Sequence, residues 1–184
     1  MKFVRQHIPE VVLIEPEMHG DDRGYFIETF RQDLFEKAIG YRVNFVQDNQ
    51  SKSVKGVLRG LHYQLPPFSQ AKLVRVVEGR VLDVAVDMRK SSPSFGQHVA
   101  AELTAQNRHQ LFVPHGFAHG FVVLSESATF AYKVDNYYAP EHDRGIAFDD
   151  DKLGIDWKFP PAELRLSDKD KTHPSLDAAK DFFE

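Results

Sequence analysis

The segment LVRVVEGRVLDVAVD, residues 73–87, decides the fold of this 184-residue chain. In its second half, strongly apolar residues alternate with acidic or small ones, which is the period of a strand with one strongly apolar face. The Glu78-Gly79 pair between the two halves carries a turn signal. The segment therefore predicts two strands, residues 72–77 and 80–88, joined as a β-hairpin.

Short apolar runs of the same kind recur on both sides of this segment. They cover residues 11–14, 25–30, 43–46, 57–63, 98–103, 110–113, 117–124 and 128–134. Ten runs within about 125 residues, separated by turn residues, are typical of an antiparallel β sandwich or barrel. We therefore expect an all-β fold class.

Helical signal is confined to two places. Residues 32–39 carry an apolar stripe, and Gly40 follows as a C-terminal cap. The last eleven residues, PSLDAAKDFFE, place Pro174 near a first turn and apolar side chains on one side. We expect a short helix at each place and no catalytic role for either.

Bulk composition narrows the functional classes. With 42% hydrophobic and 27% charged residues, the chain is long enough for one core, so we expect one domain over residues 1–184. A net charge of −4 argues against a nucleic-acid binder. The absence of cysteine excludes disulfides, thiolate nucleophiles and cysteine-bound metals. Residues 11–14 are too short an apolar run for a signal or membrane segment, so a cytoplasmic protein is expected.

Residues 42–80 are basic although the whole chain is acidic. They contain seven Lys and Arg residues against Asp48 and Glu78, which predicts a site for a small anion. Lys52 and Lys55 are better explained as a solvated face. Arg59 and Lys72 instead flank a single histidine, His62, in an apolar segment.

Strand alternation would place Arg59 and His62 on opposite faces, because they are three residues apart. Gly60 lies between them and leaves room for a bulge or for the close approach of a ligand. Only a bulge would bring both side chains to one face.

Two spacings resemble the two motifs of the cupin barrels. The matching positions are Gly56, His62, Lys72, Gly79, Pro114, Gly116 and His119. In a metal-binding cupin, the positions of Gln64 and Lys72 would be a second histidine and a glutamate. A lysine ammonium repels a divalent cation, and two imidazoles alone rarely hold a catalytic metal, so no metal is expected.

Longer stretches identify a more specific relationship. These are DDRGYFIETF (21–30), FVQDNQSKS (45–53), GVLRGLHYQ (56–64), AKLVRVVEG (71–79), DVAVDMRKSSPSFGQ (83–97), PHGFAHGFVVLSE (114–126), AYKVDNYYAPE (131–141) and LSDKD (166–170). Together they resemble the dTDP-4-dehydrorhamnose 3,5-epimerases over nearly the whole chain. The resemblance implies a cupin-type jelly roll, a homodimer with an exchanged N-terminal strand, and a dTDP-4-keto-6-deoxy sugar as substrate on the route to L-rhamnose.

The implied reaction needs no cofactor. The C3 and C5 protons of such a sugar lie next to the C4 ketone, so removing one forms an enolate, and returning a proton from the other face inverts the carbon. This requires a base, an acid on the opposite face and a cation at the ketone oxygen. His62 suits the base because it titrates near neutrality. Lys72 would stabilise the enolate oxygen, and the resemblance makes Tyr132 the acid.

A histidine base needs a carboxylate at its other ring nitrogen to orient it. The family pattern gives this role to Asp170, the last acid of LSDKD. Asp83 is a second candidate, because it lies at an alternating strand position that could face the barrel interior.

The remaining site residues concern substrate binding. Planar guanidinium groups suit the diphosphate better than lysines do. The expected contacts are Arg23 and Arg59 to the diphosphate, Tyr138 stacked on thymine, and polar contacts from Glu28, Gln47, Asp48, Asn49, His119, Asp143 and Lys169. Asp143 departs from the family, which usually has a glutamate there.

Three alternatives stay open at this point. The chain could be a mono-epimerase acting on a related dTDP-keto sugar, because such an enzyme could share the same base and orienting carboxylate. It could be a non-catalytic cupin that binds nucleotide sugars. A metal-dependent cupin oxygenase is the third possibility, and Gln64 and Lys72 count against it.

Overall fold

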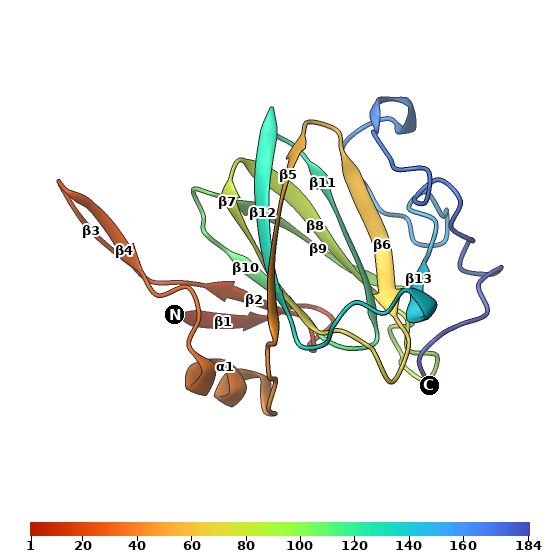
Figure 1. Cartoon of the computed structure of the whole chain (residues 1–184), viewed down its shortest axis with the longest axis horizontal. Helices are drawn as coiled ribbons and strands as arrows, with labels where there is room; N and C mark the ends of the chain where they lie inside the picture. Colours follow the sequence, from red (N-terminus) through yellow and green to blue (C-terminus); the bar gives the residue numbers. More distant parts are fainter.

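The computed structural model describes all 184 residues, Met1–Glu184. Two antiparallel sheets face each other (Figure 1). The larger has the order β1 (Lys2–Arg5), β2 (Val12–Glu15), β10 (Gln110–Val113), β7 (Lys72–Glu78), β12 (Ser127–Val134), β5 (Gln47–Val54). The smaller has the order β13 (Asp143–Gly145), β6 (Leu58–Gln64), β11 (Phe117–Val123), β8 (Arg80–Asp87), β9 (His98–Thr104). The predicted all-β jelly-roll class is confirmed.

The main core fills the space between the two sheets. Inward side chains of β7 and β10, such as Val74 and Leu111, meet inward side chains of β8 and β11, such as Ala85 and Phe121. Phe121 and Phe130 stack across the sheets with ring centroids 4.1 Å apart. This apolar packing fixes the separation of the two sheets.

Strand β8 is buried on both faces, since every residue after Arg80 is buried. Its outer face, with Leu82, Val84 and Val86, packs under the C-terminal segment rather than facing water. That segment contains the short 3-10 helices Pro140–His142 and Pro161–Glu163 and the strand β13, and otherwise runs as irregular chain beside β6 (Figure 1). A third apolar cluster lies under α1 (Gln32–Ile39), where Phe35 contacts Phe112.

The predicted helix at residues 32–39 is confirmed with its cap. Gly40 adopts a φ of 92°, and its backbone N–H donates to the Glu36 carbonyl. Such a left-handed residue favours glycine and ends a helix. None of the helices is long and apolar enough to cross a membrane.

The predicted hairpin at Glu78-Gly79 is wrong. β7 pairs with β10 and β12, whereas β8 pairs with β9 and β11, so the chain changes sheets at Gly79 instead of folding back on itself. A side chain at Gly79 would meet the Ser127 carbonyl oxygen at 2.1 Å. The turn signal was correctly located, but a corner between sheets and a hairpin use the same turn residues.

The predicted strand at residues 43–46 is also wrong. Val43 is buried under α1 without pairing, and the strand β5 begins at Gln47. β5 has the polar sequence QDNQSKSV, so its apolar content gives no sign of it. Strands β1, β3 (Met18–Asp21) and β13 were likewise not anticipated, and the run at 25–30 shortens to β4 (Gly24–Ile27).

The C-terminal helix does not form. Residues 174–184 run irregularly, and Phe183 exchanges backbone hydrogen bonds with Met88 and Lys90. The Tyr63 hydroxyl donates to the Asp181 carbonyl at 2.6 Å. An isolated helix of this length is marginal in water. Backbone pairing with the segment that follows β8 and partial burial of Phe182 and Phe183 therefore outweigh helix propensity.

Strands β3 and β4 form a separate hairpin that projects from the sandwich (Figure 1). Its side chains Met18, Tyr25 and Phe26 are exposed, with 70% of Phe26 accessible. Large exposed apolar groups gathered on one arm are typical of surfaces that contact another molecule.

Candidate active site

One cavity of about 340 Å³ opens between the two sheets. β5, β7 and β12 of the larger sheet line it on one side, β6 and β11 of the smaller sheet on the other, and residues 167–170 border it. Nine of the predicted site residues line this cavity: Arg59, His62, Lys72, His119, Tyr132, Tyr138, Asp143, Lys169 and Asp170.

A β-bulge puts Arg59 and His62 on the same side of β6. His62 lies opposite His119 of β11 and Arg59 lies opposite Phe121, so two residues of β6 face the single Gly120. Gly60 has a φ of 133°, and a Cβ there would meet the Gly120 Cα at 2.5 Å. The extra residue shifts the alternation, and both side chains reach the cavity.

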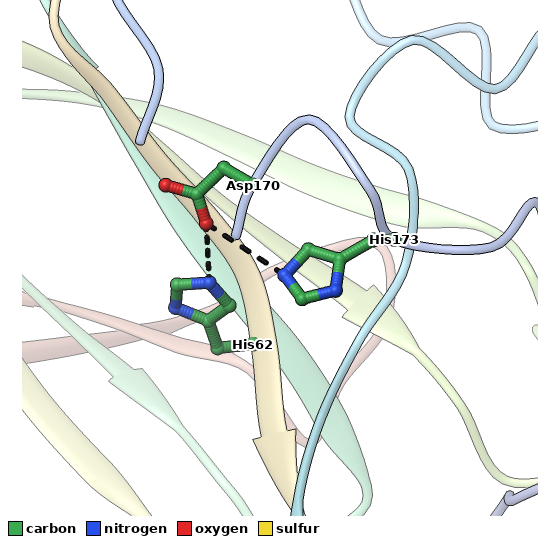
Figure 2. A group of neighbouring side chains, drawn as sticks. All are labelled: His62, Asp170 and His173. Carbon is green, nitrogen blue, oxygen red and sulfur yellow. Dashed lines mark hydrogen bonds and ion pairs between the residues drawn. The ribbon is translucent and has the colours of Figure 1, made fainter. Parts of the chain in front are cut away.

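His62 and Asp170 form a hydrogen-bonded pair. His62 Nε2 lies 2.6 Å from Asp170 Oδ1 (Figure 2). The Ser167 hydroxyl donates to Asp170 Oδ2 at 2.8 Å. Burial alone would raise the pKa of Asp170. Contacts with His173, His62 and Ser167 instead hold this pKa far below its usual range, so the carboxylate stays charged. The charged carboxylate fixes the orientation of the imidazole.

The imidazole itself is favoured in its neutral form. Burial lowers the pKa of His62 below 6.5, although Asp170 opposes the shift. A neutral imidazole near pH 7 can accept a proton. Its side chain is 30% exposed, so it is reachable from the cavity.

His119 has a carboxylate partner of its own. Its Nε2 lies 2.9 Å from Oδ2 of Asp83, which is fully buried. Asp83 therefore orients His119, and of the two candidate partners only Asp170 is in contact with His62.

Lys72 brings a buried ammonium into the cavity. Burial lowers its pKa to about 8, against the opposing attraction of Asp143 and Asp83. Lys72 is on β7 in the larger sheet, and no carboxylate lies within ion-pair distance of it. Its charge is thus free to meet a developing negative charge in a place poor in water.

Tyr132 faces the cavity from the sheet opposite His62. It is on β12 of the larger sheet, whereas His62 is on β6 of the smaller one. Burial raises the pKa of Tyr132, so the phenol carries its proton at neutral pH. A molecule in the cavity therefore has an imidazole on one side and a protonated phenol on the other.

Polar groups for anion and ring binding border the same cavity. The Arg59 guanidinium donates to the Ser53 hydroxyl at 3.1 and 3.2 Å rather than to a carboxylate. At the mouth, Asp143 binds the Lys169 ammonium and accepts a hydrogen bond from the Tyr138 hydroxyl at 3.0 Å. The Tyr138 ring is otherwise exposed and available for stacking.

Five predicted contacts lie outside this cavity. Arg23 is on the projecting hairpin, where it pairs with Asp21, and Glu28 follows the same hairpin in an exposed position. Asp48 is exposed on β5 and pairs with Lys133 at 2.9 Å. Gln47 and Asn49 share the face of β5 that carries Ser51, where the Gln47 amide donates to Asn49 at 2.7 Å.

Several residues near the site escaped the sequence analysis. Ser51, Gln70, Phe121 and Phe130 line the cavity, and His173 lies against Asp170. His173 is three residues after Asp170, and this spacing was the only sign of it in the sequence. Ser51 and Gln70 carry no chemical signal that separates them from ordinary surface residues.

The residues present do not fit the usual cupin metal site. The Gln64 amide is fully used by backbone groups: it donates to the carbonyls of Phe68 and Tyr137 and accepts from Ala139 N–H. Lys72 supplies a cation where a carboxylate would be required, and His119 is bound to Asp83. Gln64 therefore holds the chain together beside the cavity instead of facing a metal.

Comparison with known proteins agrees with this geometry. The family model described as dTDP-4-dehydrorhamnose 3,5-epimerase matches residues 5–178. The enzyme of that name from Shigella flexneri is 55% identical over 170 residues, covering 92% of this chain and 93% of its own. The Elizabethkingia anophelis crystal structure of that name superposes with a TM-score of 0.93 at 50% identity, covering 96% of this chain and 97% of its own.

A second solved structure carries a ligand. The dTDP-6-deoxy-D-glucose-3,5-epimerase of Legionella pneumophila, in complex with dTDP-4-keto-L-rhamnose, has a TM-score of 0.93 at 46% identity and covers 97% of this chain and 94% of its own. These matches extend over nearly the whole length of both partners and confirm the resemblance found in the sequence. The chain belongs to the dTDP-4-dehydrorhamnose 3,5-epimerase family.

Proposed function

We propose that this protein converts dTDP-4-dehydro-6-deoxy-D-glucose to dTDP-4-dehydro-L-rhamnose by epimerisation at C3 and C5. The observation that carries the proposal is the placement of a neutral His62 and a protonated Tyr132 on opposite sheets across one cavity. Inversion of a carbon next to a ketone needs both groups, one for each face of the sugar ring.

The proton transfers follow from the positions of these groups. His62 Nε2 is bound to Asp170, so Nδ1 takes the proton from the substrate carbon, and the imidazolium that forms is stabilised by the Asp170 charge. The electron pair moves to the C4 oxygen as an enolate. Tyr132 then delivers its proton to the opposite face of the same carbon. After His62 has released its proton to solvent and Tyr132 has regained one, the same sequence at the second carbon gives the doubly inverted sugar.

Lys72 stabilises the enolate oxygen. Removing one such stabilising group from an enzyme typically costs about 10²–10³ in kcat. Because Lys72 is buried and free of carboxylate partners, its charge is available to the oxygen. No cofactor is part of this mechanism.

Substrate binding uses the rim of the cavity. Arg59 and Lys169 would hold the diphosphate, His119 would donate to the sugar or the diphosphate, and the exposed Tyr138 ring would stack on thymine. Asp143 keeps Lys169 and Tyr138 together at the mouth.

We further propose that the protein is a homodimer in which the N-terminal hairpin is exchanged. The hairpin β3–β4 exposes Tyr25 and Phe26 and carries Arg23 away from its own cavity. Packed on a second copy, it would bring Arg23 and Glu28 to that copy's substrate, next to Gln47 and Asn49. A mass of about twice 21.1 kDa in light scattering would accord with this assembly.

Turnover in deuterated water tests the proposed reaction. With the 4-keto-6-deoxyglucose nucleotide as substrate, deuterium is expected at both C3 and C5 of the product, because each proton returned comes from a group that exchanges with solvent. Mass spectrometry and proton NMR of the product measure this. Label at one carbon only would identify a mono-epimerase. Binding without any exchange would identify a non-catalytic nucleotide-sugar protein.

The pH profile is expected to be bell-shaped, with an alkaline limb near pH 8. Lys72 has a pKa of about 8, so its charge is present below this value and lost as the pH rises through it. His62 must be neutral to act, and its pKa is lowered, so the acid limb is expected below pH 6.5. Measuring kcat/KM against pH checks both limbs. Lys72→Arg, which stays charged, should remove the alkaline limb while lowering the rate.

A further inference from the structure

The imidazole of His173 is buried without a hydrogen-bond partner. Its side chain is 9% exposed, and its Nε2 has no donor or acceptor within hydrogen-bond distance. The ring is packed on the backbone of β13, where a Cβ on Gly145 would come within 2.4 Å of it. Buried polar atoms are normally satisfied, so an unpaired one needs an explanation.

His173 points at the carboxylate that already binds His62. Its Nε2 lies 3.7 Å from Asp170 Oδ1, the same oxygen that lies 2.6 Å from His62 Nε2 (Figure 2). One ligand atom from each of the three residues can be chosen so that all lie within 4.8 Å of one another. Two imidazole nitrogens and a carboxylate oxygen thus converge on one point beside the cavity.

This donor set suits a transition metal ion of the zinc class. Zinc binds histidine nitrogen and carboxylate oxygen at roughly 2.0–2.2 Å, and three protein ligands with a fourth open position are common. Tetrahedral ligands at that distance lie about 3.4 Å apart. The distance from His173 to Asp170 is close to this value, and the distance from His62 to Asp170 has to widen by less than an ångström. The ligand nitrogens of the two imidazoles, which lie within 4.8 Å of each other, have to take up the same spacing. The adjoining cavity provides an entry path and the fourth position.

We propose that His62, Asp170 and His173 form a binding site for a divalent transition metal ion, and that occupation of this site inhibits the enzyme. The site differs from the metal site of the cupin barrels, since it shares only His62 with it and takes its other ligands from the C-terminal segment. An ion bound at His62 Nε2 would leave the ring proton on Nδ1, so Nδ1 would lose the lone pair that takes the substrate proton, and the ion would also engage the Asp170 carboxylate. Inhibition therefore rests on the proposed function, whereas metal binding does not.

The charged side chains around the three ligands reduce the affinity for a cation but do not prevent its binding. Lys169 is neutralised by its contact with Asp143, which leaves Lys72 and Arg59 as the cavity cations without a carboxylate partner. Asp170 supplies one negative charge directly to the ion, and Ser167 holds the other oxygen of that carboxylate in place. A ligand supported in this way by a neighbouring group binds metal better than an unsupported one.

Zinc binding to the intact protein tests the site directly. Chelator-treated protein is titrated with Zn²⁺ in competition with a chromophoric chelator, and one ion per chain is expected. His173→Ala and His173→Asn should each weaken binding by at least about 10–100-fold. His109→Gln changes a histidine outside the cluster and should bind as the wild type does. Thermal melting of each variant verifies its fold.

Inhibition is measured relative to each variant's own rate in the presence of chelator. Zn²⁺ is expected to inhibit the wild type and His109→Gln at the concentration at which it binds, and to inhibit the folded His173 variants only at much higher concentration. Adding chelator should restore turnover. Equal zinc affinity in the wild type and the His173 variants would overturn the site. Tight binding without inhibition would overturn the regulatory part. If the protein has no epimerase activity at all, the binding titration still decides on the site.

Discussion

His62→Ala is expected to lower kcat by about 10²–10⁴-fold, the usual cost of losing a general base. The imidazole is held by Asp170 at 2.6 Å inside the cavity, and no other side chain there combines a lowered pKa with a carboxylate partner and access to the smaller sheet's side of the cavity. Deuterium exchange at C3 and C5 should fall with turnover. Binding of dTDP, measured by calorimetry, should persist because Arg59 and Tyr138 are unchanged.

Two further variants define the role of His62. His109→Gln removes a histidine outside the cavity and should leave the rate unchanged. Asp170→Asn keeps the shape of the carboxylate but removes the charge that stabilises the imidazolium, so it should also lower kcat. Full exchange in His62→Ala would assign the base to another residue. An unimpaired Asp170→Asn would show that orientation by Asp170 does not matter.

Tyr132→Phe is expected to abolish inversion while leaving exchange in place. A base on one face can remove a proton and return it, but it cannot invert the carbon, so two groups are required. The phenylalanine keeps the ring against Phe130 and removes only the hydroxyl, so the fold should be preserved. Substrate recovered from deuterated water should carry label, and product should be nearly absent, as seen by NMR.

Tyr138→Phe is the matched control for Tyr132→Phe. The Tyr138 hydroxyl binds Asp143 at the mouth, so its loss should affect KM more than kcat. If Tyr132→Phe epimerises at the wild-type rate, the returning proton comes from water or from another residue. Loss of inversion in Tyr138→Phe alone would give Tyr138 that role.

Most of the fold could be predicted from the sequence because its strands are apolar. Strands β8 and β11 contribute to the core between the sheets and are recognisable from composition alone. β5 could not be recognised because its side chains are polar and it pairs only along one edge. The C-terminal segment was misread for the opposite reason. Its apolar residues have helical spacing, but the backbone of Phe183 pairs with Met88 and Lys90, and the apolar side chains are partly buried against the smaller sheet without forming a helix.

The site was predictable where chemistry restricts the residue type. Few residue types can supply a base, an orienting carboxylate, an ammonium or a phenol, and the family resemblance located the residues that do. Which face each side chain occupies was not predictable, because it depends on pairing partners. Asp83 is an example. Alternation allowed its side chain to face the interior, but only the structure shows that the Asp83 carboxylate contacts His119 and not His62. His173 is close to Asp170 only because Gly145 leaves space for its ring.

The bulge at Gly60 has a consequence for how such proteins could change during evolution. The bulge depends on a residue without a side chain, because a Cβ at Gly60 would meet the Gly120 Cα at 2.5 Å. If a larger residue at this position forced β6 into simple alternation, Arg59 and His62 would face opposite sides, because they are three residues apart, and one of them would turn away from the cavity. Substitution of this one codon is thus a short mutational route from a catalyst to an inactive binding protein with the same architecture. Related sequences without a glycine at this position are therefore expected to lack epimerase activity.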